Sequence, residues 1–203
     1  MKIVLATHNK HKTREFKRIL STLGIDIEIL TLDEIGFSDE IIEDGSTFEE
    51  NAMIKARCAS RLGYIGIADD SGLAVDALNG APGIFSARYA GDICNDKANN
   101  EKLLRELSGV KDDERSARFV CAIACSFPDG KNDFTVKADT EGFITHKESG
   151  EGGFGYDPLF FCEKYGKTFA ELTPDEKNGI SHRGRAIKLF AEKFAQIMSE
   201  NKG

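Results

Sequence analysis

The sequence predicts an α/β protein built on a mixed β-sheet that is flanked by helices. Helix-like and strand-like segments alternate along the first part of the chain, which is typical of parallel strands joined by helices. The middle of the chain instead has two long strand-like segments joined by Pro128-Asp129-Gly130-Lys131, a sequence typical of a tight hairpin turn. A sheet that combines both kinds of connection contains parallel and antiparallel pairs.

The first part of the chain has the apolar patterns of short strands and amphipathic helices. These patterns predict strands over 1–6, 25–30, 64–68 and 73–75, and helices over 10–23 and 46–62. The pattern Ser46-x-x-Glu49 is typical of a capping box, so we expect Ser46 to open the second helix. The residues expected on the buried face of the first helix are Phe16, Ile19, Leu20 and Leu23.

The rest of the chain predicts one helix capped by Asn95 or Asp96, then several strands, then a C-terminal helix. The expected strands cover 117–127, 133–139, 142–145 and 159–162. Cys121 and Cys125 lie in the first of these, where they are expected to be small buried apolar residues rather than zinc ligands. Ser181 should open the last helix, whose apolar stripe is Ala186, Leu189, Phe190, Phe194 and Ile197.

Composition limits the class of protein. The 203 residues are enough for one domain, or for two closely packed lobes. A net charge of −7 argues against a general binder of nucleic acid or membrane surfaces. The five cysteines form no C-x-x-C pair, and no apolar run is long enough for a signal peptide or a membrane span. We therefore expect a cytoplasmic protein with reduced thiols.

The most informative segment contains Asp69 and Asp70 at the end of an apolar run. Ser71-Gly72 follows at once, and we expect the backbone to turn there with amides facing a ligand. Carboxylates held in this way are expected Mg²⁺ ligands, and Mg²⁺ in proteins usually accompanies a phosphate. The alternative is an ordinary Asp-Asp-Ser-Gly turn that closes a strand.

Two further segments could support a phosphate and metal site. Residues 7–12, Thr-His-Asn-Lys-His-Lys, precede and open a helix, where backbone amides and basic side chains attract anions. The alternative is that Thr7 or Asn9 only caps the helix and that the lysines are solvated. An acidic run over 39–50 is the second segment, and Glu43 is its candidate metal ligand, although such runs are usually solvated surface.

Two segments near the C-terminus could contact a flat ligand. Residues 152–158 combine three glycines with Phe154 and Tyr156, which allows close backbone approach and ring stacking. Further along, Lys177 precedes a helix whose first turn holds His182 and Arg183. Cations at a helix N-terminus oppose the helix dipole, so a ligand acceptor would explain them. The alternatives are a glycine-rich turn with core aromatics and a pair of exposed basic residues.

Together these segments closely resemble the inosine triphosphate pyrophosphatase family. The resemblance rests on five motifs in order, THNKHK, EDGSTFEENAMIKA, ADDSGLAVDALNGAPGIFSARYAG, GGFGYDPLF and SHRGRAIK. It covers essentially the whole chain, and it departs at His8, where many members have a small residue. The resemblance implies a single pyrophosphatase domain over 1–203, with an elongated mixed sheet, two lobes and a central active-site cleft. It also implies a homodimer and Mg²⁺ as the cofactor.

The resemblance also implies roles for individual residues. Asp70 is similar to the family's proton acceptor and Mg²⁺ ligand, with Glu43 as the second metal carboxylate and Asp69 in support. The residues expected to hold the triphosphate are Thr7, Asn9, Lys12, Lys55, Ser71 and Lys177, and the substrate site also includes His8, Lys10 and His11. The residues expected to enclose the base are Phe154, Gly155, Tyr156, Asp157, His182 and Arg183.

The implied reaction is hydrolysis of dITP, ITP or XTP to the nucleoside monophosphate and pyrophosphate. A related family that acts on modified pyrimidines or 7-methyl-GTP is one alternative, and Ser181-His182-Arg183 argues against it. A nucleotide sensor without activity is another, but such a protein has no use for Asp70 beside a metal. The acidic balance of the chain argues against a nucleic-acid-binding module.

Overall fold

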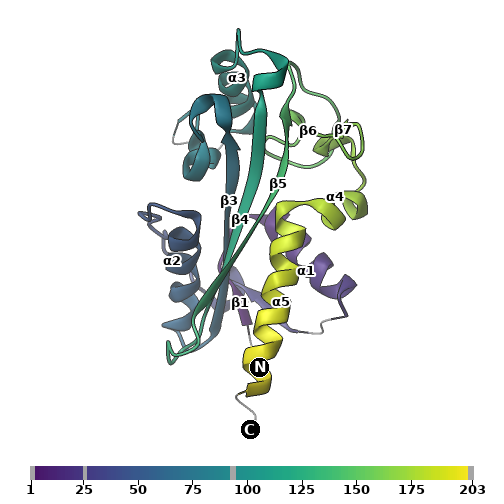
Figure 1. The fold of residues 1–203 in the computed structure, drawn as a ribbon. Helices are drawn as coiled ribbons and strands as arrows, with labels where there is room; N and C mark the ends of the chain where they lie inside the picture. The colour runs from purple at the N-terminus through teal and green to yellow at the C-terminus, as the bar shows by residue number, and fades with distance from the viewer. Residues whose placement is uncertain (1–2, 25–26, 92–94, 201–203) are drawn as a thin grey trace. The chain divides into compact units, whose positions relative to one another are not determined.

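A computed structural model describes residues 3–24, 27–91 and 95–200 (Figure 1). In this part of the chain the sheet has seven strands in the order β2-β1-β3-β4-β5-β6-β7. The strands are β1 (Ile3–Leu5), β2 (Ile29–Thr31), β3 (Ile65–Val75), β4 (Ser116–Ser126), β5 (Phe134–Ile144), β6 (Phe160–Cys162) and β7 (Lys167–Thr168). The α-helices are α1 (Lys10–Thr22), α2 (Phe48–Ser60), α3 (Asp96–Glu106), α4 (Pro174–Ile180) and α5 (His182–Glu200), and short 3₁₀ helices lie between some of the elements.

The sheet is mixed, as the sequence predicts. β1 runs parallel to both β2 and β3, whereas β6 is antiparallel to β5 and to β7. β4 and β5 are neighbours joined by residues 127–133, a connection too short for the crossover that parallel strands need. The α/β class and the mixed sheet are therefore confirmed.

The chain divides into two compact units. The first unit consists of residues 1–70, 121–138 and 183–203, and the second of residues 71–120 and 139–182. β3 passes from the first unit into the second between Asp70 and Ser71. The elongated single domain with two lobes around a cleft stays a prediction.

The first unit has a core on each face of its part of the sheet, because strand side chains alternate between faces. Ile3 and Leu5 of β1 pack with apolar residues of α1 and α5, whereas Val4 packs with α2. Figure 1 shows α1 and α5 together on one side of these strands and α2 on the other. The two cores differ in kind, since Ile, Leu and Phe dominate the first and alanine dominates the second.

Helix α2 lies unusually close to the sheet. The apolar part of its buried face is Ala52, Ala56 and Ala59, which are fully buried. Opposite them is Gly66 of β3, where an added Cβ would lie 2.0 Å from the Ala56 carbonyl oxygen. Small side chains on both surfaces therefore set the short distance between α2 and β3.

The second unit has its own aromatic core. Phe119 of β4 stacks on Phe169 with ring centres 5.7 Å apart, and its ring also lies 4.6 Å from that of Phe160 in β6. Leu103 and Leu107, at the end of α3, are fully buried in the same cluster. Helix α3 is thereby fixed to the strands of its unit, and its N-cap is Asn95, one of the two candidates that the sequence offers.

Four local predictions differ from the structure. β5 is one continuous strand of 11 residues, where the sequence predicted separate strands over 133–139 and 142–145. β3 is one continuous strand of 11 residues, where the sequence predicted two short strands on either side of a turn. Thr47, not Ser46, is the N-cap of α2, because its side chain accepts the backbone N–H of Glu50. Helix α4 was not predicted at all, and Thr173 opens it with a capping box.

The predicted buried faces are largely correct. Leu23 and Leu189 are the exceptions, with 38% and 42% of their surface exposed. Cys121 and Cys125 are fully buried, and burial raises the pKa of the Cys121 thiol to about 12, so it behaves as an apolar group. The predicted starts of the first two strands, at 1–2 and 25–26, lie outside the described residues. No helix among the described residues is long and apolar enough to cross a membrane.

Candidate active site

Asp69 and Asp70 lie inside β3 and point to opposite faces of the sheet. Consecutive residues of a strand alternate in direction, so Asp69 shares the face of Ile67 and Asp70 shares the face of Ala68. The prediction of a turn at Ser71-Gly72 is wrong, because both residues continue the strand. The sheet therefore presents one carboxylate toward α1 and α5, and the other toward α2.

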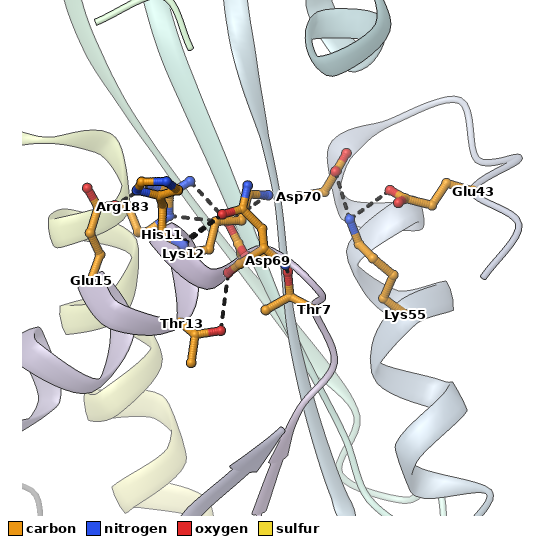
Figure 2. A network of polar contacts seen from close by, with 11 residues as sticks. Thr7, His11, Lys12, Thr13, Glu15, Glu43, Lys55, Asp69, Asp70 and Arg183 are labelled. Carbon is orange, nitrogen blue, oxygen red and sulfur yellow. Dashed lines mark hydrogen bonds and ion pairs between the residues drawn. The ribbon is translucent and has the colours of Figure 1, made fainter. Parts of the chain in front are cut away.

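On the first of these faces, Asp69 belongs to a buried network of alternating charges (Figure 2). Lys12 Nζ lies 3.2 Å from Asp69 Oδ2, and Arg183 donates to the same oxygen from Nε and Nη2, each at 3.3 Å. Arg183 Nη1 also donates to Glu15 Oε2 at 2.5 Å. Burial by itself would raise the pKa of Asp69, but Lys12 and Arg183 outweigh it and hold that pKa well below its usual range. Asp69 is therefore a fixed negative charge.

The same network accounts for Arg183 at the start of α5. The sequence offered a ligand acceptor or an exposed position as explanations for the two cations there. Both His182 and Arg183 are buried, and for Arg183 the acceptors are protein carboxylates, Asp69 and Glu15. The His182 ring stacks on Phe119, with ring centres 4.7 Å apart. Contact of either residue with a base stays a prediction.

On the other face, Asp70 shares a lysine with Glu43 (Figure 2). Lys55 Nζ donates to Glu43 Oε2 at 2.7 Å and to Asp70 Oδ1 at 2.8 Å. Burial raises the pKa of Asp70, against the opposing pull of Lys55. Asp70 Oδ2 is buried and has no hydrogen-bond partner among the residues that the structure describes. We call Glu43, Lys55 and Asp70 the α2-side cluster. Its lysine donates to one oxygen of each carboxylate, so Asp70 Oδ2 remains as an acceptor without a donor in the cluster.

The segment that follows Glu43 is held against α2 by contacts that the sequence did not predict. Asn51 Oδ1 accepts the Gly45 backbone N–H at 2.9 Å, and Glu50 accepts both the N–H and the hydroxyl of Ser46. Asn51 lies one turn before Lys55 on α2, so both side chains lie on the same side of the helix. That Asn51-x-x-x-Lys55 spacing is the signal that could have revealed Asn51.

In the segment before α1, Asn9 is the N-cap. Its side chain accepts the backbone N–H groups of His11 and Lys12 at 2.9 and 3.2 Å, while Thr7 Oγ1 accepts the Asn9 N–H. Asn9 thus caps the helix, but Lys12 is not solvated as that alternative expects, because it pairs with Asp69. His8 lies 3.5 Å from Asp33 and is exposed, as is Lys10. Binding of a triphosphate by this segment stays a prediction.

In the second unit, the predicted base-binding residues form a loop that is fixed by its own side chains. Asp157 Oδ2 accepts the Phe154 backbone N–H at 2.8 Å and the Lys177 ammonium at 2.6 Å. The same ammonium lies 5.1 Å from the centre of the Phe154 ring, a cation–π contact. The Tyr156 hydroxyl donates to the Ser86 carbonyl oxygen at 2.8 Å. Lys177, Asp157 and Phe154 thus lie together, and α4 supplies the lysine.

The α2-side cluster fits a hard divalent cation only in part. Across residues 3–24, 27–91 and 95–200, no group of three or more His, Cys, Asp or Glu side chains is arranged to hold a metal. Mg²⁺, however, is commonly held by one or two carboxylates, with waters and substrate phosphates completing its shell. Glu43 and Asp70 with its unpartnered Oδ2 meet that description, and Lys55 already bridges them as a cation. Asp69 faces the other way.

The fold is shared with solved structures of a defined class of protein. The Ham1 protein of Staphylococcus aureus is similar over 100% of both chains, with 42% sequence identity and a TM-score of 0.84. The sequence model of the Ham1 family matches residues 3–193. The chain therefore belongs to the Ham1 family.

Named relatives agree with the resemblance found in the sequence motifs. A protein of Bacillus subtilis named dITP/XTP pyrophosphatase is 52% identical over 190 residues, which cover 93% of this chain and 94% of the relative. A Bacillus cereus protein of the same name is 50% identical over 196 residues, which cover 96% of this chain and 95% of the relative. The similarity thus spans nearly the whole of each chain.

Proposed function

We propose that this protein hydrolyses dITP, ITP and XTP to the nucleoside monophosphate and pyrophosphate. The observation that carries the proposal is the α2-side cluster, with its buried, unpartnered carboxylate oxygen at Asp70. It occurs in a chain that is about half identical to proteins named dITP/XTP pyrophosphatase. The activity removes non-standard purine nucleotides from the pool that polymerases use.

Glu43 and Asp70 would hold Mg²⁺, with the phosphate oxygens of the substrate completing its coordination. When bound, the ion neutralises charge on the phosphoryl oxygens and makes a nearby water more acidic. Asp69, which the resemblance gives a supporting role, contacts Lys12 and Arg183 in the structure, so its support is to hold those two cations.

Asp70 is the proton acceptor of the proposal. Water attacks the α-phosphorus, the bond between this phosphorus and the bridging oxygen to the β-phosphate breaks, and the proton of the water passes to Asp70. Its Oδ2 is buried and meets no donor among the described residues, so it is able to accept this proton. Lys12, Lys55 and Lys177 supply positive charge for the triphosphate and for the leaving pyrophosphate.

The base would be recognised by Phe154, Gly155, Tyr156 and Asp157 with His182 and Arg183. Hypoxanthine and xanthine present an O6 acceptor and an N1–H donor. Adenine instead presents an N6 amino donor and an N1 acceptor at the same two positions. A pocket with donors for O6 leaves buried groups unpaired when adenine enters, and each such group costs about 1–3 kcal/mol. ATP is therefore expected to be the poorest substrate. A cytoplasmic homodimer completes the proposal.

Two measurements test this function. ITP, dITP, XTP, GTP and ATP are assayed with Mg²⁺ for release of monophosphate and pyrophosphate, and equal kcat/KM for ITP and ATP would contradict the proposal. Hydrolysis of ITP is then run in ¹⁸O-labelled water. Attack at the α-phosphorus places the label in the monophosphate, whereas label in pyrophosphate would show attack at the β-phosphorus and overturn the mechanism.

A further inference from the structure

Two side chains of α3 hold both backbone polar groups of Gly155. Asp96 Oδ2 accepts the Gly155 N–H at 2.7 Å, and Asn100 Nδ2 donates to the Gly155 carbonyl oxygen at 3.2 Å. Asp96 and Asn100 are four residues apart, so they lie one turn apart on the same side of the helix. All three residues belong to the second unit, and we call the two α3 side chains the Gly155 clamp.

Gly155 is a position where the backbone conformation needs to be held. Its φ is +61°, in the left-handed region that favours glycine. Asp157 already holds the Phe154 N–H on one side of Gly155, and glycine has wide conformational freedom, so a direct restraint on its own peptide groups narrows its conformations further. The clamp supplies that restraint from a helix that is itself anchored in the core through Leu103 and Leu107.

Asn100 has features that simple packing does not explain. It is 3% exposed, and its Nδ2 makes a second hydrogen bond, to Glu148 Oε1 at 2.8 Å. Its Oδ1 is buried and has no hydrogen-bond partner in the described part of the chain. A buried polar atom left unsatisfied is costly, and an apolar side chain would avoid that cost. The amide is therefore explained by what its nitrogen does, which is to tie Gly155 and Glu148 to α3.

From these contacts we infer that Asp96 and Asn100 are positioning residues for recognition of the purine base. By fixing the backbone of Gly155, they limit the positions open to its neighbour Phe154. The Phe154 ring itself is contacted by the Lys177 ammonium. The inference rests on the proposed function, in which residues 154–157 enclose the base. Loosening the clamp should weaken binding of the nucleoside part of the substrate, while the binding of its phosphates stays the same.

The test uses two substitutions at Asp96 and one control. Asp96→Ala removes the acceptor for the Gly155 N–H, whereas Asp96→Asn keeps a side-chain oxygen that is able to accept it. Asn95→Ala removes the N-cap of the same helix, which weakens α3 without removing a contact to Gly155. Asn100→Asp removes the donor to the Gly155 carbonyl oxygen and serves as a second, independent break of the clamp.

The nucleotide measurements are KM and kcat for ITP and ATP and the inhibition constant of tripolyphosphate. We expect Asp96→Ala and Asn100→Asp to raise KM for ITP about 3- to 10-fold and to narrow the preference for ITP over ATP, with kcat changed less than about twofold. Asp96→Asn should keep KM for ITP and the preference for ITP close to those of the unmodified protein. The inhibition constant of tripolyphosphate should be the same in all the variants. An unchanged KM, or an equal loss in Asn95→Ala, would overturn the inference.

Hydrogen exchange separates failure of the clamp from failure of the proposed function. The backbone amides of residues 150–157 should exchange faster in Asp96→Ala than in the unmodified protein, with no nucleotide present. Unchanged exchange would disprove the clamp even if the protein hydrolyses ITP. Conversely, an unmodified protein that does not hydrolyse ITP would disprove the proposed function and the role in base recognition, whatever the exchange shows.

Discussion

Asp69 and Asp70 are neighbours in β3, yet their surroundings are opposite in kind. Asp69 faces Lys12 and Arg183, which hold its pKa well below the usual range against the effect of burial. Asp70 faces Lys55 and Glu43, and there burial prevails, so its pKa is raised. Two adjacent carboxylates thus differ because a strand turns them to different faces of one sheet. One holds two cations in place, and the other keeps a buried oxygen that meets no donor among the described residues.

The largest effect on activity should come from Asp70→Asn, which tests the carboxylate on the α2 face of the sheet. The change keeps the shape and an acceptor for Lys55, but it removes the charge that would accept the proton and hold the metal. We expect ITP hydrolysis to fall about 10²- to 10⁴-fold. Far-UV circular dichroism and the thermal midpoint should remain close to those of the unmodified protein. A purified variant with half of the original activity would disprove the role of Asp70.

Asp69→Asn, the same chemical change one residue earlier, should act mainly on stability. It leaves Lys12 without its ion pair and takes one of two carboxylates from Arg183, and removing one partner of a buried pair typically costs about 3–5 kcal/mol. The measurement is the free energy of unfolding in urea, compared with that of Asp70→Asn. Equal losses of stability in the two variants would remove the distinction between the two faces.

Glu15→Gln tests the outer end of the Asp69 network and should have a smaller effect. Arg183 keeps Asp69 as its partner, and the Glu15 side chain is 21% exposed, so solvent moderates the loss. We expect the free energy of unfolding to fall by about 1–2 kcal/mol. A loss as large as that of Asp69→Asn would mean that Glu15, rather than Asp69, is the main counter-charge of Arg183.

The smallest effect is expected on the Asp70 side, from Asn51→Ala. Without its amide oxygen, the Gly45 N–H loses its partner and Glu43 is held less firmly. We expect the Mg²⁺ concentration that gives half-maximal activity to rise about 2- to 10-fold, and calorimetric Mg²⁺ affinity to fall by a similar factor. Asn51→Asp keeps an acceptor and is the matched control. If neither measurement changes, Asn51 does not support binding of Mg²⁺.

The sequence was sufficient for the elements whose signals are local. The mixed sheet followed from helix–strand alternation and from the turn at 128–131, and the N-caps Asn9 and Asn95 follow from residue type and position. The continuous β3 was missed because Asp69, Asp70, Ser71 and Gly72 all have low strand propensity. Pairing of β3 with β1 and β4 in the sheet overrides that propensity.

The candidate site was predictable as a set of motifs but not as a set of contacts. Motif resemblance gave Glu43, Lys55 and Asp70, and the structure brings them together. Glu15 carried no signal, because its partner Arg183 is 168 positions away in the chain. Asn100 was missed for a similar reason, since its contact with Gly155 spans 55 positions.

The alanine-lined contact between α2 and the sheet restricts how this protein is able to change in evolution or by design. Enlarging Ala52, Ala56 or Ala59 would add apolar surface but would push α2 away from β3, and Lys55 would move with it. The face covered by α1 and α5, with its larger side chains, has more ways to be repacked. Substitutions that stabilise the chain by filling its core should therefore accumulate on that face, while the α2 face stays small to keep Lys55 within reach of Asp70.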